Sequence, residues 1–515
     1  IRRPPRSTPL YSSAASDVYK RQICMDLHYI SAVEAIKKFK DKSLSPVELV
    51  NSIIERSEKI NPKINAHNFT FYEKAIECAK KSEQKYLTNS STLPLEGIPV
   101  AIKDEEDIKG QPNTNGSLIL KDHIANRTMI DVERIVNSGA VIHCRTTTPE
   151  FSTTSFTHSK LWGVTRNPWN LDYTPGGSSG GSGASLAAGC STLATGSDIG
   201  GSIRIPASAC GLVGFKPPHG RNPQEAPFNH DQYCVVGPMA RTVKDCALMQ
   251  NVMSGPHPKD ITSLKPKLNI PDEFENIKNW KIAYSMDLGF FEIDKDVEKN
   301  TLDIINKLKE LGAQVEEVKI KWNKKELEDT CYNYYAHLFA NFVAELIPKY
   351  EEELTDYARD VGSTARIINK ALVERKKINH PTMGVDLGMT LYECNKVAGK
   401  MYEEFGPIIH KYDVFVCPTL SIPAVKADIN LFKDKILING KEINSPDLGW
   451  TLCYPFNILC RLPVLSIPSG IASNGVPTGV QIVGKPYDDI PVFQAGYQLE
   501  QIEPWFQNNK LKPNL

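Results

Sequence analysis

Two periodicities of apolar residues divide the chain into helical and extended blocks. Residues 28–87 repeat apolar side chains every three or four positions, which predicts helices. Within them, Ser45-Pro46 combines an N-cap serine with a proline suited to the first turn, so a second helix is expected to begin there. Residues 296–312 have one apolar face and end at Gly312, which predicts a helix with a glycine C-cap.

Short apolar runs predict buried strands between the helices. The runs occupy residues 98–104, 139–146, 281–287, 313–320, 412–420, 462–470 and 478–485. Because strands and helices alternate over most of the chain, we expect an α/β fold with a large mixed β-sheet core flanked by helices on both faces. The block 325–410 reads as mostly helical, and the polar stretch 261–280 as a bridge within one domain. Residues 25–515 are therefore expected to form a single domain.

The composition narrows the classes of function. The 515 residues are 41% hydrophobic and 23% charged, with a formal net charge of zero, which gives no broad basic field for nucleic acid. The twelve cysteines form no CxxC pair and no Cys/His group at zinc spacing, so we expect free thiols in a reducing, cytoplasmic compartment and no metal. No run of about 18 apolar residues is present, so no membrane span is expected.

The first 24 residues differ from the rest of the chain. They are basic, rich in serine and proline, and lack a helical or strand period. They resemble the conceptual translation of sequencing-adaptor DNA, and the alternative is a natural disordered arm. We expect Met25 to be the true start. Residues 1–24 hold five basic residues and one acid, so without them the formal net charge becomes −4 and still argues against nucleic acid.

The stretch 176–206 concentrates nine glycines and seven serines in 31 residues. Leu186, Leu193 and Ile199 interrupt the glycines, so a flexible linker is disfavoured and tight backbone packing near a ligand is predicted. A phosphate loop is excluded because the stretch lacks GxxxxGK[ST]. "GGSSG" formally fits the nucleophile elbow of α/β-hydrolases, but the polar "NPWNLDYTP" precedes it in place of an apolar strand.

A serine nucleophile needs an adjacent base, and the stretch contains neither histidine nor lysine. Lysine acts as a base only when neutral, and burial favours its neutral form. Lys103 ends the apolar run "GIPVAIKD", which makes it the best candidate. The alternative role for Lys103 is a structural ion pair with Asp104 or another acid.

Four segments carry a family resemblance. Residues 97–117, 162–189, 196–221 and 454–486 resemble the amidase signature family in order and spacing, and Ser178 and Ser202 lie 24 residues apart as that family requires. The resemblance extends over about 28–500. It implies that Ser202 is the nucleophile that forms an acyl-enzyme and that Ser178 bridges it to the base, Lys103. It also implies a cis peptide between Gly177 and Ser178.

The same resemblance assigns supporting roles. Backbone N–H groups of Ile199, Gly200, Gly201 and Ser202 would form an oxyanion hole, where side chains at the glycines would obstruct the approach. Asp198, Arg204 and Ser179 would hold this loop, and the Ser152 carbonyl would lie near the substrate amide together with Ser178. The remaining serines of the stretch are expected to serve packing: Ser182, Ser185, Ser191 and Ser197.

The resemblance implies an amidohydrolase that cleaves a carboxamide C–N bond without a metal or organic cofactor. Its catalytic core would span about 91–260, and 325–410 would be a variable helical region that shapes the substrate pocket. The alternatives are the glutamine-hydrolysing component of a tRNA-dependent amidotransferase and a catalytically silent binding homologue. The expected partner is a small-molecule amide substrate, and a homodimer is a further possibility that the sequence does not decide.

Two features bear on the choice between these functions. Glutamine would need a charged clamp, for which Arg145, Arg166 or Arg461 are candidates. The aromatic cluster in 332–342 fits either a hydrophobic substrate pocket or the protein core. The segments "FTHSKLWGVTRNPWN" and 214–238 resemble stand-alone amidases more than amidotransferase components, so we expect an enzyme that works without a partner protein.

Overall fold

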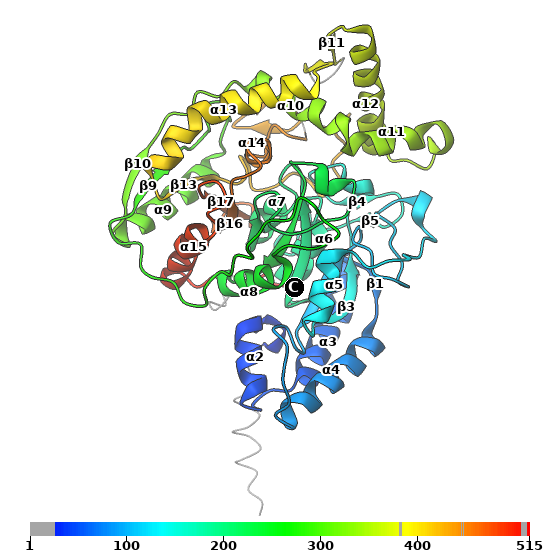
Figure 1. The fold of residues 1–515 in the computed structure, drawn as a ribbon, viewed down its shortest axis with the longest axis vertical. Coiled ribbons are helices and arrows are strands. Elements are labelled where there is room, and N and C mark those ends of the chain that lie inside the picture. Colours follow the sequence, from blue (N-terminus) through cyan, green and yellow to red (C-terminus); the bar gives the residue numbers. More distant parts are fainter. Residues whose placement is uncertain (1–25, 381–383, 444, 446, 506–511) are drawn as a thin grey trace, which may run out of the picture.

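The computed structural model describes residues 26–380, 384–443, 445, 447–505 and 512–515, so the predicted arm 1–24 lies outside the described residues. One mixed sheet of eleven strands runs through the molecule in the order β1-β3-β2-β6-β8-β7-β16-β17-β13-β9-β10 (Figure 1). Parallel pairing joins β2 to β3 and β6, and joins β9 to β10 and β13. The predicted α/β class with a large mixed sheet is confirmed.

The strands of this sheet are short. They are β1 (His67–Thr70), β2 (Pro99–Lys103), β3 (Val141–Thr146), β6 (Leu193–Asp198), β7 (Val213–Lys216), β8 (Val235–Ala240), β9 (Lys281–Tyr284), β10 (Gln314–Glu317), β13 (Val414–Pro418), β16 (Val464–Ile471) and β17 (Pro477–Val483). Three two-stranded ribbons lie outside it: β4 (His158–Ser159) with β5 (Gly163–Val164), β11 (Ile378–Asn379) with β12 (Asp386–Leu387), and β14 (Leu437–Ile438) with β15 (Lys441–Glu442).

Helices cover both faces of the sheet and both ends of the molecule. They are α2 (Ala32–Lys40), α3 (Pro46–Ile64), α4 (Tyr72–Leu87), α5 (Ile130–Asn137), α6 (Gly180–Ala187), α7 (Arg204–Cys210), α8 (Val243–Met253), α9 (Lys295–Glu310), α10 (Lys324–His337), α11 (Phe339–Tyr350), α12 (Asp356–Glu374), α13 (Leu391–Lys411), α14 (Pro455–Ile458) and α15 (Ile490–Ile502). One face carries α8, α9 and α15, and the other carries α6 and α7. Figure 1 places α10–α13 at one end and α2–α4 at the other.

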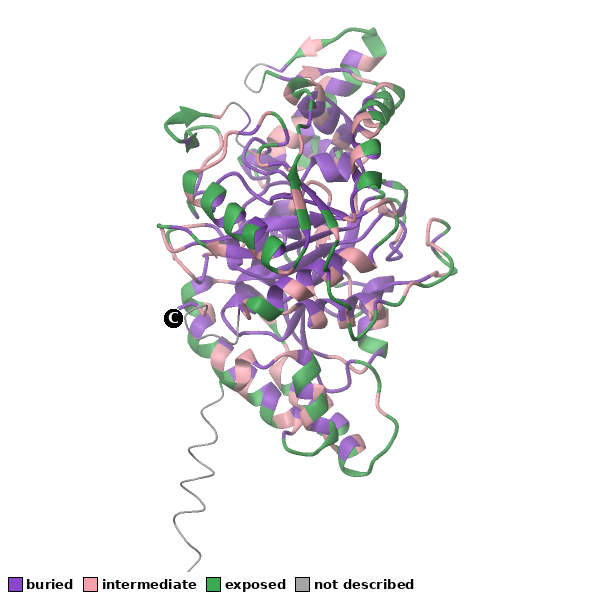
Figure 2. Cartoon of the chain, turned by 90° about the vertical axis from the view of Figure 1, so that its left-hand side faces the viewer, coloured by how far each residue is buried: buried purple, intermediate pink, exposed green. Residues whose placement is uncertain are grey.

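Buried residues gather in the sheet and in the helix faces packed against it (Figure 2). The helix ends follow the predicted chemistry. Ser45 caps α3 in a capping box with Glu48, and Gly312 follows the end of α9 with φ +88°. Among the described helices, none is both long enough and apolar enough to cross a membrane.

The sheet topology brings together the two segments that carry Lys103 and Ser202. Strands β2 and β6 are parallel neighbours, with Val100 opposite Leu193, so their carboxyl ends lie at the same edge of the sheet. Lys103 ends β2, and the loop from Asp198 to Ser202 leaves the end of β6. Open α/β sheets bind ligands at such edges.

The glycine-rich stretch folds into regular structure that the hydrophobic pattern did not predict. Helix α6 has the sequence GGSGASLA, and every one of its residues is buried. A Cβ at Gly180 would collide with the Thr157 side chain, and one at Gly181 with the backbone of Thr147. The small residues therefore let α6 lie directly against neighbouring backbone, which supports the tight packing expected from the sequence.

Candidate active site

Lys103 is completely buried and contacts three polar groups through its Nζ atom. Nζ lies 2.7 Å from Ser178 Oγ, 2.9 Å from Ser197 Oγ and 3.1 Å from a carboxylate oxygen of Glu105. The geometry thus contains both arrangements that the sequence left open, a serine contact and an ion pair. The partner in the ion pair is Glu105, whereas Asp104 accepts hydrogen bonds from Thr114 N at 3.0 Å and from Asn68 Nδ2 at 2.7 Å.

Ser178 lies in a crowded turn before α6. The peptide between Gly177 and Ser178 is cis, and a Cβ at Gly177 would meet the backbone of Phe156 at 2.5–2.7 Å. The next residue, Ser179, joins this turn to the loop after β6. Its N–H donates to the Ser202 carbonyl at 3.2 Å, and its hydroxyl accepts from Ser197 N at 3.3 Å.

Ser202 and Ser178 face two adjoining cavities. The first, here called the Ser202 cavity, is bordered by Ser202, Ile199, Gly200, Tyr335, Phe339 and Asp360. The second, the Ser178 cavity, is bordered by Ser178, Glu105, Ser152, Phe228, Phe339 and Phe342. Ser152, Ile199 and Phe339 line both cavities, so the two cavities adjoin at these residues. Within the described part of the chain the Ser202 hydroxyl has no hydrogen-bond partner, and ligand-free sites often lack the hydrogen bonds of the reacting complex.

The loop after β6 offers free backbone donors, but not at every position expected. The N–H of Gly201 already donates to Asp198 Oδ1 at 2.9 Å, so the prediction that Gly201 supplies an oxyanion donor is not met in this conformation. Position 201 requires glycine for steric reasons, because φ is +127° and a Cβ there would lie 2.5 Å from Cys453 Cβ. Among the described residues no acceptor faces the N–H groups of Ile199, Gly200 and Ser202.

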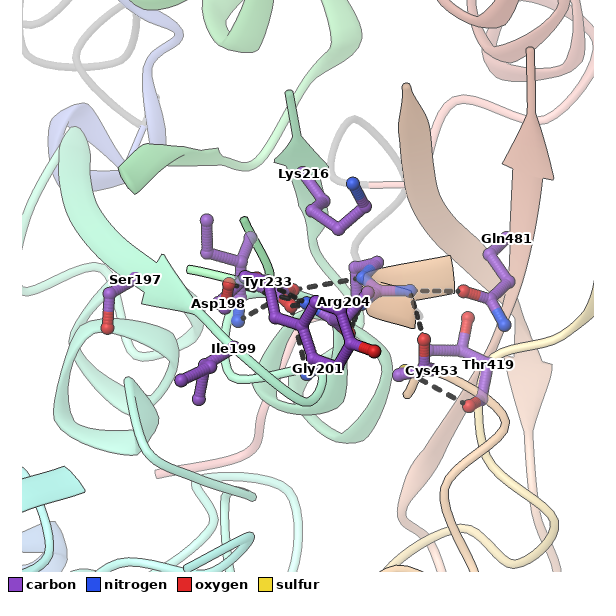
Figure 3. Close-up of polar contacts among 12 residues, drawn as sticks. Ser197, Asp198, Ile199, Gly201, Arg204, Lys216, Tyr233, Thr419, Cys453 and Gln481 are labelled. Atoms are coloured by element: carbon purple, nitrogen blue, oxygen red, sulfur yellow. Dashed lines mark hydrogen bonds and ion pairs between the residues drawn. The ribbon is translucent and has the colours of Figure 1, made fainter. Parts of the chain in front are cut away.

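Asp198 and Arg204 form a buried ion pair that fixes this loop (Figure 3). Arg204 donates from Nε and Nη2 to the Asp198 carboxylate at 2.9 Å each, and from Nη1 to Gln481 and the Cys453 carbonyl. Burial alone would raise the pKa of Asp198, but the Arg204 guanidinium holds it below its usual value. Asp198 is thus an anion that organises the loop around Ser202.

Ser152 lies in a left-handed turn beside the site. Phe151 and Ser152 have φ values of +52° and +57°, a conformation that L-residues adopt rarely. The Ser152 hydroxyl donates to the Glu105 carboxylate, which is also the ion-pair partner of Lys103. The turn that borders both cavities is therefore tied to the lysine through Glu105.

The aromatic cluster near 332–342 mostly lines the cavities. Tyr332 and Tyr335 border the Ser202 cavity, Phe342 borders the Ser178 cavity, and Phe339 borders both. Tyr334 is a core residue that stacks on Tyr233 with ring centroids 3.5 Å apart. The question left open by the sequence is therefore answered mainly in favour of the pocket.

The charges that border the cavities are all acidic. No arginine or lysine is among the described residues lining either cavity. The candidates for a glutamine clamp lie elsewhere. Arg145 Nη2 donates to the Lys103 carbonyl at 3.1 Å, and Arg166 Nη1 donates to the Leu171 carbonyl at 2.9 Å. Arg461 borders a separate surface pocket with Tyr402.

Sequence reasoning missed two groups at the lysine. Ser197 was expected to serve packing, but its hydroxyl contacts Lys103 Nζ. Glu105 was not singled out, although it lies two residues after the lysine in the acidic run "KDEED". That run was the available signal, but four acids follow Lys103 directly, and only the chain path after β2 determines which one reaches Nζ.

The fold also gathers a His/Cys group that residue spacing did not reveal, with ligand atoms of His67, His143 and Cys144 within 4.8 Å of one another. His67 Nε2 lies 2.8 Å from Ser185 Oγ, and His143 Nε2 lies 3.0 Å from the Cys190 carbonyl. Burial lowers the pKa of His67 to about 3 and that of His143 to about 4. Both rings are neutral core side chains, and the group lies outside both cavities.

Comparisons with known proteins identify the family of this chain. The Amidase family model matches residues 48–493. The acylamidase of Rhodococcus erythropolis is 31% identical over 483 residues, covering 93% of this chain and 97% of its own length. A component of the glutamyl-tRNA(Gln) amidotransferase of Carboxydothermus hydrogenoformans is 33% identical over 498 residues, covering 93% of this chain and 98% of its own length.

The likeness extends to solved structures. A bacterial aryl acylamidase of the amidase signature family superposes with a TM-score of 0.84 and 26% sequence identity, over 95% of this chain and 99% of that chain. Because the family model and these relatives each span most of the chain, the chain belongs to the amidase family, as its sequence motifs predicted.

Proposed function

We propose that this amidase-family hydrolase is a free-standing enzyme that cleaves the C–N bond of a neutral, hydrophobic carboxamide. Ser202 is the nucleophile, Ser178 the proton bridge and Lys103 the base. The contact of Lys103 Nζ with Ser178 Oγ at 2.7 Å supports this order, since a bridge must touch the base. No step requires a cofactor.

The reaction begins with neutral Lys103. Nζ takes a proton from the Ser178 hydroxyl while Ser178 takes the proton of Ser202, and Ser202 Oγ forms a bond to the amide carbon. The carbonyl oxygen becomes an oxyanion that accepts hydrogen bonds from the free N–H groups of Ile199, Gly200 and Ser202. The C–N bond then breaks as the proton returns through Ser178 to the nitrogen, and the amine leaves.

The second half repeats the relay with water. Water gives a proton through Ser178 to Lys103 and attacks the acyl-enzyme, and the ester bond to Ser202 Oγ breaks as the serine regains its proton. The products are a carboxylic acid and an amine. Ser179, Asp198 and Arg204 hold the loop, and the Ser152 turn orients the amide beside Ser178.

Each cavity is assigned one part of the substrate. Since the acyl group is bonded to Ser202, it occupies the Ser202 cavity, and the amine that receives its proton from Ser178 occupies the Ser178 cavity. Phe228, Phe339 and Phe342 around the second cavity favour an arylamine or bulky alkylamine.

The absence of arginine and lysine among the described cavity residues carries the assignment of a neutral substrate. The α-carboxylate of glutamine would enter a cavity that already holds Asp360 and Asp447, without a cation to pair with. The amidotransferase components among the relatives keep glutamine hydrolysis as the second candidate. We place the enzyme in the cytoplasm because all eleven cysteines within the described residues have free thiols.

The test uses purified protein without any partner. A neutral arylamide should be hydrolysed, and free glutamine should not. Lys103→Ala should lower kcat on the arylamide by at least about 10³-fold, the scale of losing a general base together with its relay. Lys376→Ala, at an exposed position, is the matched control and should keep full activity. Glutaminase activity that appears only when tRNA and a partner protein are supplied would replace this proposal with the second candidate.

A further inference from the structure

Glu105 occupies a position that the Ser202–Ser178–Lys103 relay does not use. Its carboxylate borders the Ser178 cavity, and its side chain is 16% exposed. One oxygen lies 3.1 Å from Lys103 Nζ, and the same oxygen accepts the hydrogen bond of the Ser152 hydroxyl. Glu105 therefore joins the base to the left-handed turn that borders the substrate site.

Glu105 is an anion at neutral pH. Burial alone would raise its pKa, but the Lys103 ammonium and the hydroxyls of Ser152 and Ser197 together hold that pKa below its usual value. Among the described residues, no other carboxylate lies within 4.0 Å of Lys103 Nζ. The charge beside the base is thus supplied by this one residue.

The other titratable groups around Lys103 are arranged differently. Burial raises the pKa values of Asp104 and Glu106, and it raises that of Cys234 well above the usual value. Each of these groups has its own partners. Asp104 accepts hydrogen bonds from Thr114 and Asn68, and Glu106 accepts one from Thr195 and lies against Asp131. Cys234 faces Gln224, and Arg145 donates to backbone carbonyls.

We propose that Glu105 is a positioning residue for the amidase reaction, which stabilises the ammonium formed when Lys103 accepts the proton and anchors the Ser152 turn against it. This inference rests on the proposed function. In the reaction, proton transfer creates an ammonium on Lys103 and an oxyanion on the substrate. A fixed carboxylate in contact with the ammonium lowers the energy of this charge-separated state, because it is oriented before the reaction begins.

The cost of this arrangement appears at low pH. A carboxylate in contact with an amine favours the charged form of the amine, whereas the proposed base must be neutral when it accepts the proton. Removing the charge should therefore have two opposite effects. The acid limb of the pH profile should move to lower pH, and the rate on the plateau should fall because the ammonium formed in the reaction loses its counter-charge.

The experiment compares Glu105→Gln with Glu105→Asp. Glu105→Gln keeps the shape and removes the charge, so the acid limb of kcat/KM should move down by about one pH unit or more, and plateau kcat should fall at least about tenfold. Glu105→Asp keeps the charge and should hold the limb within about 0.3 pH unit of wild type. A merely structural role would lower kcat in both variants without moving the limb.

A second readout separates this inference from the proposed function. The rate at which an alkyl fluorophosphonate labels Ser202 reports the relay without any amide, since Ser202 Oγ displaces fluoride from phosphorus as its proton passes to Lys103. Labelling should show the same shift of the acid limb in Glu105→Gln. If wild type hydrolyses no neutral amide, yet the labelling profile of Glu105→Gln is shifted from that of wild type in this way, the substrate assignment fails and the role of Glu105 stands. An unmoved limb in a variant that melts at the wild-type temperature overturns the inference.

Discussion

Gly200 lies directly against the Tyr335 hydroxyl, so a single methyl group tests how the loop proposed to supply the oxyanion donors is held. A Cβ at Gly200 would lie 2.5 Å from Tyr335 Oη, and the next atom, Tyr335 Cζ, would be 3.6 Å away. Ordinary contact needs about 3.5 Å, so the hydroxyl or the loop must move by about 1 Å. That movement also disturbs the hydrogen bond of Tyr335 Oη to the Ile199 carbonyl, which measures 3.1 Å.

The expected loss of kcat follows from the size of this movement. An oxyanion donor is worth about 10²–10³ in kcat, and a misplacement of about 1 Å can cost about 10². We therefore expect Gly200→Ala to lower kcat on a neutral arylamide about 100-fold. Tyr335→Phe removes only one hydrogen bond, worth about 0.5–1.5 kcal/mol, and should lower kcat by no more than about tenfold.

The double variant identifies the cause. Because the hydroxyl is the clashing atom, Gly200→Ala/Tyr335→Phe should be at least about tenfold faster than Gly200→Ala, a rescue of at least about 1.4 kcal/mol; the coupling energy is this rescue plus the loss measured for Tyr335→Phe alone. Gly201→Ala is the matched control, since its φ of +127° and its contact with Cys453 do not involve Tyr335, and Tyr335→Phe should not rescue it. A double variant no faster than Gly200→Ala would refute the reasoning, and so would equal rescue of Gly201→Ala.

Three further predictions test other parts of the structure. Asp198→Asn leaves the buried Arg204 guanidinium without its counter-charge and should lower the free energy of unfolding in guanidinium chloride by about 3–5 kcal/mol; a loss below about 1 kcal/mol would contradict the anchoring role. Burial holds the pKa of His143 at about 4 against 6.5, so the unfolded chain takes up this proton first as the pH falls below about 6.5. Acidification from pH 7 to pH 5 should thus destabilise wild type by about 2 kcal/mol more than His143→Asn, and identical pH dependence would exclude this cause. Phe342→Ala should raise KM for a bulky arylamide and leave KM for the matching primary amide unchanged. Ala336→Leu should instead change KM according to the length of the acyl group. The reverse pattern would exchange the acyl and amine assignments of the two cavities.

The fold was predictable where a periodic apolar pattern matched the structure. Helix α3 begins at the predicted Ser45-Pro46 cap, and β2 occupies the predicted apolar run at 98–104. Helix α6 and strand β6 were not predicted as elements. Their burial depends on small residues that let other backbone approach, as at Gly181 against Thr147, and this leaves no apolar period to detect.

The sequence predicted those site residues whose type and position together indicated one role. Lys103 stood out because it ends an apolar run, where burial favours the neutral form that a base needs; its link to Ser178 was implied by the family resemblance, and the two side chains are in contact. The choice of Glu105 over Asp104 as the ion-pair partner was not predictable, because adjacent side chains leave the end of β2 in different directions. The occupied N–H of Gly201 likewise depends on where the Asp198 carboxylate folds back.

Geometry and the positions of the histidines support the proposal that Lys103 is the base. No histidine is among the described residues that line either cavity, and burial lowers the pKa values of both His158 and His219. His158 Nε2 contacts the Ile429 carbonyl at 3.1 Å, and His219 Nε2 contacts the Asn229 carbonyl at 3.0 Å, so both rings are engaged away from the serines. Lys103 alone among basic side chains of the described residues touches Ser178, because the parallel pairing of β2 with β6 brings its strand end beside the glycine loop. The sheet therefore places the proposed base, a lysine at the end of β2, in contact with an acid, and the proposal predicts that its reactivity depends on that acid as much as on the serines.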